Sequence, residues 1–152
     1  LLSCGTHDDN ILSEQDKDAI KNQVAPLVSQ IIQSSESGDI ENGLALYSDV
    51  PEFLSISNGV VSDHEKFVEG NRASFALLES QKFTETLMNY FFIDGQTVVV
   101  TWGGRALVKL KGGQEMNLDP LAVTLVFKKS DGKWKVVYSH ESGVLAASEL
   151  NK

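Results

Sequence analysis

Basic residues are in short supply in this 152-residue sequence, where 13 Lys and Arg stand against 21 Asp and Glu for a formal net charge of −8. A nucleic-acid-binding surface needs a basic footprint for the phosphate groups, so nucleic acid is not an expected partner. No apolar run approaches the roughly 18 residues of a membrane-spanning helix. Hydrophobic residues still make up 41% of the chain, which is enough to bury the core of one folded domain.

Cysteine is almost absent, because Cys4 is the only one in the sequence. A single thiol excludes an internal disulfide and a multi-cysteine metal site. Residues 1–5 (Leu-Leu-Ser-Cys-Gly) resemble a bacterial lipobox, in which the signal peptide is cut before a cysteine that then carries lipid. The alternative is a fragment that begins by chance beside an ordinary cysteine. The resemblance implies lipidation at Cys4, a polar tether through residue 12, and a lipid-anchored, extracytoplasmic position in the bacterial cell envelope, either periplasmic or at the surface.

The first third of the sequence has the apolar spacing of amphipathic helices. Ser13 is a suitable N-cap, and apolar residues recur every three to four positions from Ile20 to Ile31. Pro26 lies inside this stretch, so we expect a kink there or a later helix start. A second, shorter helix is expected after the helix-ending pair Gly38-Asp39.

The rest of the sequence predicts a hairpin, a third helix and an antiparallel sheet. Residues 53–57 and 60–61 flank the turn Asn58-Gly59, and a helix is expected over residues 63–81. Beyond this helix the apolar period changes to two, and glycine-containing turns separate four expected strands: 83–93, 97–111, 116–129 and 134–140. Gly103-Gly104 and Asp119-Pro120 each predict a bulge or bend inside a strand.

This order of elements resembles the NTF2-like superfamily. Residues 130–143 (Ser-Asp-Gly-Lys-Trp-Lys-Val-Val-Tyr-Ser-His-Glu-Ser-Gly) look like the closing segment of its SnoaL-like and DUF4440-type branch, and are similar to the end of the association domain of calmodulin-dependent kinases. The resemblance implies a cone-shaped α+β (cystatin-like) fold, a curved antiparallel sheet wrapped around three helices, over residues 13–145 with a C-terminal tail from 146 to 152. It says little about function, because this superfamily includes isomerases, dehydratases, ligand-binding pockets and assembly modules.

His140 is a candidate general base. Strict alternation places it on the same face of the last strand as Trp134, Val136 and Tyr138, pointing into the cone or toward a partner subunit. The alternative is a histidine that fixes the end of the strand through a hydrogen bond to a neighbouring loop.

Asp119 and Tyr47 are the other candidate catalytic residues. Asp119 stands at a strand irregularity, where a carboxylate can act as a buried base, and Tyr47 can donate a hydrogen bond to a developing oxyanion. They match no motif of the steroid-isomerase branch residue by residue. The alternatives are a turn role for Asp119 and a core role for Tyr47.

Four further residues are candidate ligand contacts: Trp102, Phe92, Arg105 and Tyr138. Trp102 and Phe92 suit either a pocket wall or the core. A bulge at the glycine pair would turn Arg105 inward toward an anionic ligand, and the alternative places it on a solvated face beside Lys109.

No metal or cofactor is expected. His7 and His64 stand beside acidic residues but form no spaced set of ligands. The sequence also lacks a nucleophile elbow, a P-loop and a dinucleotide-binding glycine motif.

The leading hypothesis is therefore an extracytoplasmic domain that binds a small, largely apolar ligand in the cone. The rivals are an isomerase or dehydratase that uses His140, Asp119 and Tyr47, and an assembly module with a filled cone. A homodimer is also expected through the exposed side of strands 97–111 and 116–129, because these strands carry apolar residues such as Val99 and Leu107 on the second face as well.

Overall fold

The computed structural model describes residues 11–146, which form three helices and one curved, unclosed sheet. Cys4 and His7 lie outside the described residues. The elements are α1 (Glu14–Ser37), α2 (Ile40–Leu44), β1 (Leu54–Ser57), β2 (Val60–Ser62), α3 (His64–Leu77), β3 (Leu78–Asp94), β4 (Thr97–Leu110), β5 (Glu115–Ser130) and β6 (Lys133–Leu145). The strand order is β2-β1-β6-β5-β4-β3, with β1 parallel to β6 and every other pair antiparallel. The predicted α+β fold is thus confirmed.

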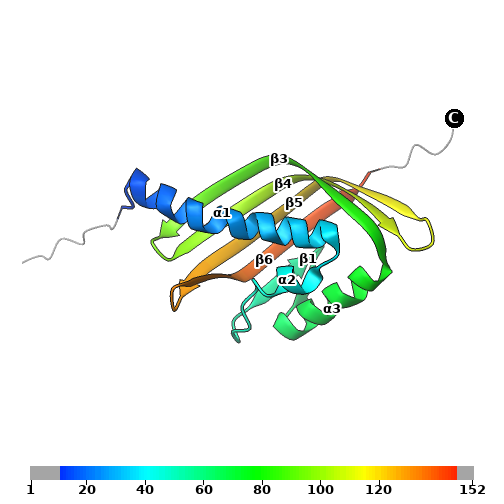
Figure 1. The fold of residues 1–152 in the computed structure, drawn as a ribbon, viewed down its shortest axis with the longest axis horizontal. Coiled ribbons are helices and arrows are strands. Elements are labelled where there is room, and N and C mark those ends of the chain that lie inside the picture. Colours follow the sequence, from blue (N-terminus) through cyan, green and yellow to red (C-terminus); the bar gives the residue numbers. More distant parts are fainter. Residues whose placement is uncertain (1–10, 147–152) are drawn as a thin grey trace, which may run out of the picture.

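Helix α1 lies lengthwise across the concave face of β3–β6 (Figure 1). Ser13 and Asp16 form a capping box at its start, and Gly38 ends it in the left-handed conformation at φ 79°. The helix is continuous from Glu14, so the alternative of a later start near Ala25 is wrong. Its inner face packs on the main core, which consists of Ile20, Val24, Val28, Val98, Val100, Leu125, Phe127, Trp134 and Val136. Within residues 11–146, no helix combines the length and apolarity needed to cross a membrane.

Helix α3 is shorter than the sequence predicted. It ends at Leu77, and β3 begins at the next residue, whereas the apolar spacing extended the helix to residue 81. None of its side chains is buried. The helix therefore covers the sheet without contributing to the core.

The predicted irregularities in β4 and β5 are present. The register between these strands shifts around Arg105, and the register between β5 and β6 shifts at Asp119-Pro120, whose peptide bond is cis. Glycine is needed at position 104 because a Cβ atom there would collide with the Thr84 carbonyl oxygen and lie 2.7 Å from Cη2 of Trp102.

One irregularity in β6 was not predicted. Val126 pairs with Tyr138 and Phe127 with Val136, so Val137 is an extra residue between two rungs of the ladder. This bulge reverses the alternation in the second half of the strand. Trp134 and Val136 face the core, whereas beyond the bulge it is Ser139 that is buried.

Candidate functional site

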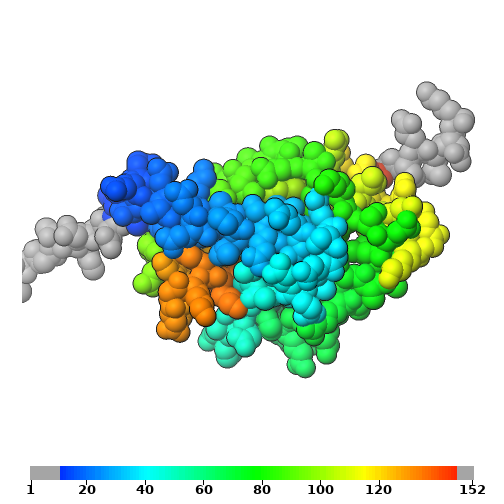
Figure 2. Space-filling model, viewed as in Figure 1, coloured from blue at the N-terminus to red at the C-terminus, as the bar shows by residue number. Residues whose placement is uncertain are grey.

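A cavity of about 750 Å³ lies between α3, the C-terminal half of α1 and the inner face of the sheet. The surface is hollowed between the cyan end of α1 and the green segment that joins α3 to β3 (Figure 2). Every strand and two of the helices contribute lining residues. The lining residues include Tyr47, Ser55, Ser57, Lys66, Phe67, Ser74, Phe83, Trp102, Val123, Leu125, Ser139 and Glu141.

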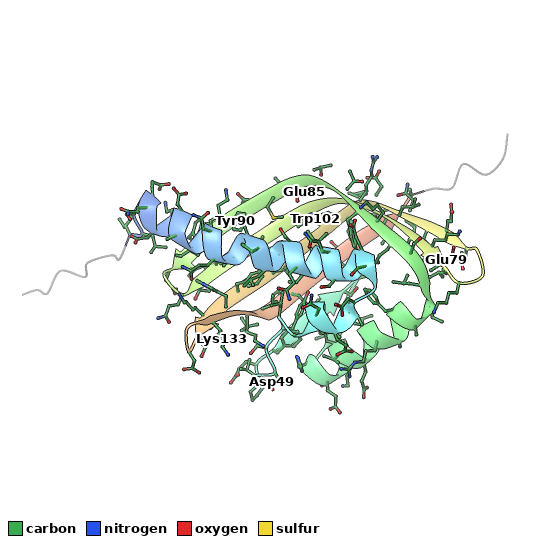
Figure 3. All side chains as sticks on the ribbon, in the orientation of Figure 1. Asp49, Glu79, Glu85, Tyr90, Trp102 and Lys133 are labelled. Atoms are coloured by element: carbon green, nitrogen blue, oxygen red, sulfur yellow. The ribbon has the colours of Figure 1, made fainter. Side chains whose placement is uncertain are left out.

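The wall formed by α1 and β3–β5 is mainly apolar, with Ser35 and Gln81 as its polar members. Trp102 on β4, labelled in Figure 3, belongs to a buried cluster against which Ile32 of α1 packs. Its ring meets Phe83 edge-on with centroids 5.9 Å apart. Val123 and Leu125 continue this surface along β5. Because this part of the lining is apolar, contact with an apolar ligand group is favoured over contact with water.

The neighbouring strands of the same sheet, β1 and β6, carry a polar stripe. The parallel register pairs Ser55 with Ser139 and Ser57 with Glu141. The Ser139 hydroxyl donates to the Ser55 hydroxyl at 2.8 Å, and both residues are buried. These pairs place hydroxyl and carboxyl groups on one side of a largely apolar cavity.

Glu141 is the carboxylate of this stripe. Its side chain is exposed, because it borders the open cavity, but the surrounding protein removes much of its bulk water. This desolvation raises the pKa of Glu141 above its ordinary value, and hydrogen bonding from the Ser57 side chain partly opposes the rise. The carboxyl therefore gains its charge at a higher pH than a carboxyl on the open surface.

Tyr47 faces the same end of the cavity. It is fixed by a bridge to β6, where Ser48 N–H donates to the Val136 carbonyl at 2.8 Å. Its ring lies 4.6 Å from that of Phe67 on α3, centroid to centroid. Desolvation, followed by the negative charge of Glu141, raises the pKa of Tyr47, so the phenol remains a neutral hydrogen-bond donor at physiological pH.

Helix α3 closes the cavity from the side. Asp63 caps its start by accepting from the Lys66 N–H at 2.9 Å. Arg72 makes a bidentate ion pair with Glu41 of α2, with Nε–Oε1 and Nη2–Oε2 distances of 2.6 and 2.8 Å. This pair holds α3 against α2, while the Phe67 side of the helix faces the cavity.

The structure places two of the predicted site residues, Tyr47 and Trp102, in the cavity wall. Phe92 instead packs against the main core and stacks on Tyr90, with ring centroids 6.5 Å apart. Arg105 follows the predicted bulge but is exposed and does not line the cavity. The bulge therefore does not turn this side chain inward.

His140, Tyr138 and Asp119 do not line the cavity either. The extra residue Val137 moves the first two to the face opposite Trp134, which corrects the expectation that they share its face. Asp119 is exposed at the shift in β5 register. The predicted catalytic set of His140, Asp119 and Tyr47 is thus not assembled at this site.

The residue that sequence reasoning missed is Glu141, together with Ser57 and Ser139. The signal was the apolar pair Val136-Val137, which breaks strict alternation and permits a bulge. After such a bulge, the alternate residues Ser139 and Glu141 point inward. Residues 11–146 contain no group of three His, Cys, Asp or Glu side chains suited to a metal ion.

The sequence profile of the SnoaL-like domain matches residues 24–147. The chain belongs to the SnoaL-like family. No curated protein matches this SnoaL-like chain.

Solved structures with the NTF2-like fold align with most of this chain. An NTF2-like protein from Streptomyces avermitilis, provisionally named a dehydratase, is 23% identical with a TM-score of 0.72, over 85% of this chain and 99% of the other. The hexachlorocyclohexane dehydrochlorinase LinA-type3 from Novosphingobium barchaimii is 15% identical with a TM-score of 0.71, over 89% and 95%. An NTF2-like superfamily protein from Salmonella enterica is 14% identical with a TM-score of 0.73, over 90% and 99%. At these identities the likeness shows the fold alone.

Proposed function

We propose that this SnoaL-like domain binds a small, largely apolar ligand in the cavity between α3 and the sheet. The observation that carries this proposal is the division of the cavity into an apolar wall and a polar stripe. A volume of about 750 Å³ lies within the usual range for small-molecule sites. A ligand would lay its apolar body against Trp102 and Val123 and direct a polar group toward Glu141.

The rival hypothesis of an assembly module required a cone packed shut by Trp102, Phe92 and Tyr47. Trp102 and Tyr47 border an open cavity, and Phe92 packs against the main core. Two convergent polar groups, Tyr47 and Glu141, also face that cavity. This geometry favours a ligand over a purely structural cone.

A second candidate is an enzyme that transfers protons. It is favoured by the neighbouring positions of a titratable carboxyl, Glu141, and a neutral phenol, Tyr47. Here Glu141 would take the role that the sequence assigned to His140 and Asp119. Glu141→Gln would then abolish turnover while a bound substrate is retained, and an unchanged rate would exclude this candidate.

We further propose that the domain acts outside the cytoplasm on a lipid anchor at Cys4. The support is the lipobox-like sequence of residues 1–5. Cys4→Ser is expected to move the protein from the membrane fraction to the supernatant, and continued membrane fractionation of this variant would exclude the anchor.

Ligand binding can be tested with N-phenyl-1-naphthylamine, a neutral fluorophore that brightens in apolar surroundings. We expect saturable binding to the wild type, weakened about tenfold or more by Ser74→Trp, because the added ring takes up space in the cavity. Ala73→Trp is the matched control, since Ala73 is exposed on the same helix but does not line the cavity. Equal binding by the two variants would contradict the proposal.

A further inference from the structure

Glu141 has no cationic partner among the described residues. It is the one carboxylate among the residues of 11–146 that line the cavity, where the other titratable side chains are Tyr47 and Lys66. The Lys66 ammonium lies 3.6 Å from Asp63 at the start of α3, and its side chain is 72% exposed. The cavity thus holds a carboxyl group whose counter-ion the described part of the chain does not supply.

A partly desolvated carboxyl can keep its proton, or it can meet a positive charge that offsets the loss of hydration. Desolvation raises the pKa of Glu141, and none of the ion pairs among residues 11–146 involves this carboxyl. One hydroxyl, that of Ser57, opposes the rise without cancelling it.

Two aromatic rings accompany this carboxyl at the cavity wall. Tyr47 and Phe67 both line the cavity and lie 4.6 Å apart, and Glu141 is near enough to Tyr47 for its charge to raise the pKa of the phenol. The faces of aromatic rings attract cations, and this attraction strengthens where water is excluded. A cavity lined by a carboxylate and two such rings is suited to an ammonium group.

We propose that the ligand of this cavity is an amine that carries an apolar body, with its ammonium group at Glu141, Tyr47 and Phe67. This inference rests on the proposed ligand-binding function and adds the chemical class of the ligand. The apolar body would contact Trp102 and Leu125 on the neighbouring strands β4 and β5. The net charge of −8 favours the approach of a cation to the protein.

The elements around Glu141 present few other charges to this ammonium. The adjacent strands contribute Ser57 from β1 and Val123 from β5, and neither titrates. Tyr47 stays neutral because its pKa is raised, and Lys66 is paired with Asp63. Affinity for the amine should therefore increase as pH rises through the pKa of Glu141, and should decline again where the amine loses its own proton.

The test uses three naphthalenes that differ in one head group: 1-naphthylmethylamine as the cation, 1-naphthylmethanol as the neutral analogue and 1-naphthoate as the anion. Calorimetric titration of the wild-type protein at pH 7.5 is expected to show the amine binding about tenfold or more tightly than the alcohol, as a charge-assisted hydrogen bond provides. The carboxylate ligand should bind more weakly than either.

The Glu141→Gln variant removes the charge and keeps the size of the side chain. In this variant the amine should lose its preference over the alcohol. An amine that binds no better than the alcohol, or a preference that survives Glu141→Gln, would overturn the inference and leave the binding function standing. Failure of all three naphthalenes and of N-phenyl-1-naphthylamine to bind the wild type would overturn the binding function, and this inference with it.

Discussion

Two glutamates of this domain occupy opposite electrostatic environments. Glu36, in the last turn of α1, accepts hydrogen bonds from the Phe83 backbone N–H at 2.8 Å and from the Lys82 ammonium at 3.0 Å, and the first of these chiefly lowers its pKa. Glu141 borders the cavity, where desolvation raises its pKa. Since a pKa difference between folded and unfolded states makes stability depend on pH, the two residues should act in opposite directions.

Replacement of Glu141 by Gln should increase stability at neutral pH. The folded protein holds the Glu141 proton more tightly than the unfolded chain, so wild-type stability falls as pH rises from the ordinary value of 4.5 to the raised pKa. The glutamine of Glu141→Gln does not titrate, so the stability of this variant does not decrease over that pH range. Urea unfolding between pH 4 and pH 8 should show a variant that matches the wild type at low pH and has the higher midpoint above pH 7.

Glu36→Gln provides the control of opposite sign. The lowered pKa of Glu36 means that its carboxylate contributes stability above the unfolded value of 4.5, and that this contribution is lost as pH falls through the folded pKa. Glu36→Gln should therefore be less stable than the wild type at pH 7 and approach it in acid. A Glu141→Gln variant that behaves in the same way as Glu36→Gln would show that the cavity does not desolvate Glu141.

At the residue scale, the sequence identified the side chains whose positions follow from type and phase. Trp102 was expected at a pocket wall or in the core, and it lines the cavity while also packing in a smaller cluster with Leu121. Tyr47 was expected as a donor to an oxyanion or as a core residue, and it lines the cavity. Arg105 and Asp119 were singled out for standing at irregularities, but a bulge does not by itself fix which way its flanking side chains point.

Turns and periodicity located every strand of the sheet, but they did not locate the end of α3 and the start of β3. The apolar pattern did not predict the boundary between α3 and β3, because Leu77 and Leu78 suit both a helix and a strand. The structure places the change of period there, without a connecting loop. Helix α3 consequently contributes a cover with no buried side chain, which leaves the space beneath it open.

The bulge in β6 shows why alternation alone could not place the site. Phase counted from Trp134 is correct as far as Val136, and one extra residue then inverts it. Whether a strand accommodates such a residue depends on its partners, here β5 on one side and the parallel β1 on the other. That pairing is a property of the whole sheet, so sequence reasoning selected His140 where the structure places Ser139 and Glu141 inward.

At the scale of the whole molecule, the described residues leave apolar side chains uncovered on the outer face of the sheet. On β3 and β4 these are Leu87, Phe91, Ile93 and Leu107, each more than half exposed. They alternate with inward residues such as Met88 and Tyr90, which pack against the core. An apolar second face of this kind is typical of a sheet that is covered by another chain.

The homodimer predicted from the sequence can be tested at Leu107, which is 52% exposed on the outer face of β4. Light scattering should show the wild type as a dimer at micromolar concentration, and Leu107→Asp should weaken association by about a hundredfold or more, because an unpaired charge would be buried between the subunits. Val61→Asp is the matched control, since Val61 is 58% exposed on β2 at the far edge of the sheet. Circular dichroism of both variants should match the wild type, which separates dissociation from unfolding. A monomeric wild type, or equal dissociation by the two variants, would place the subunit contact elsewhere or exclude it.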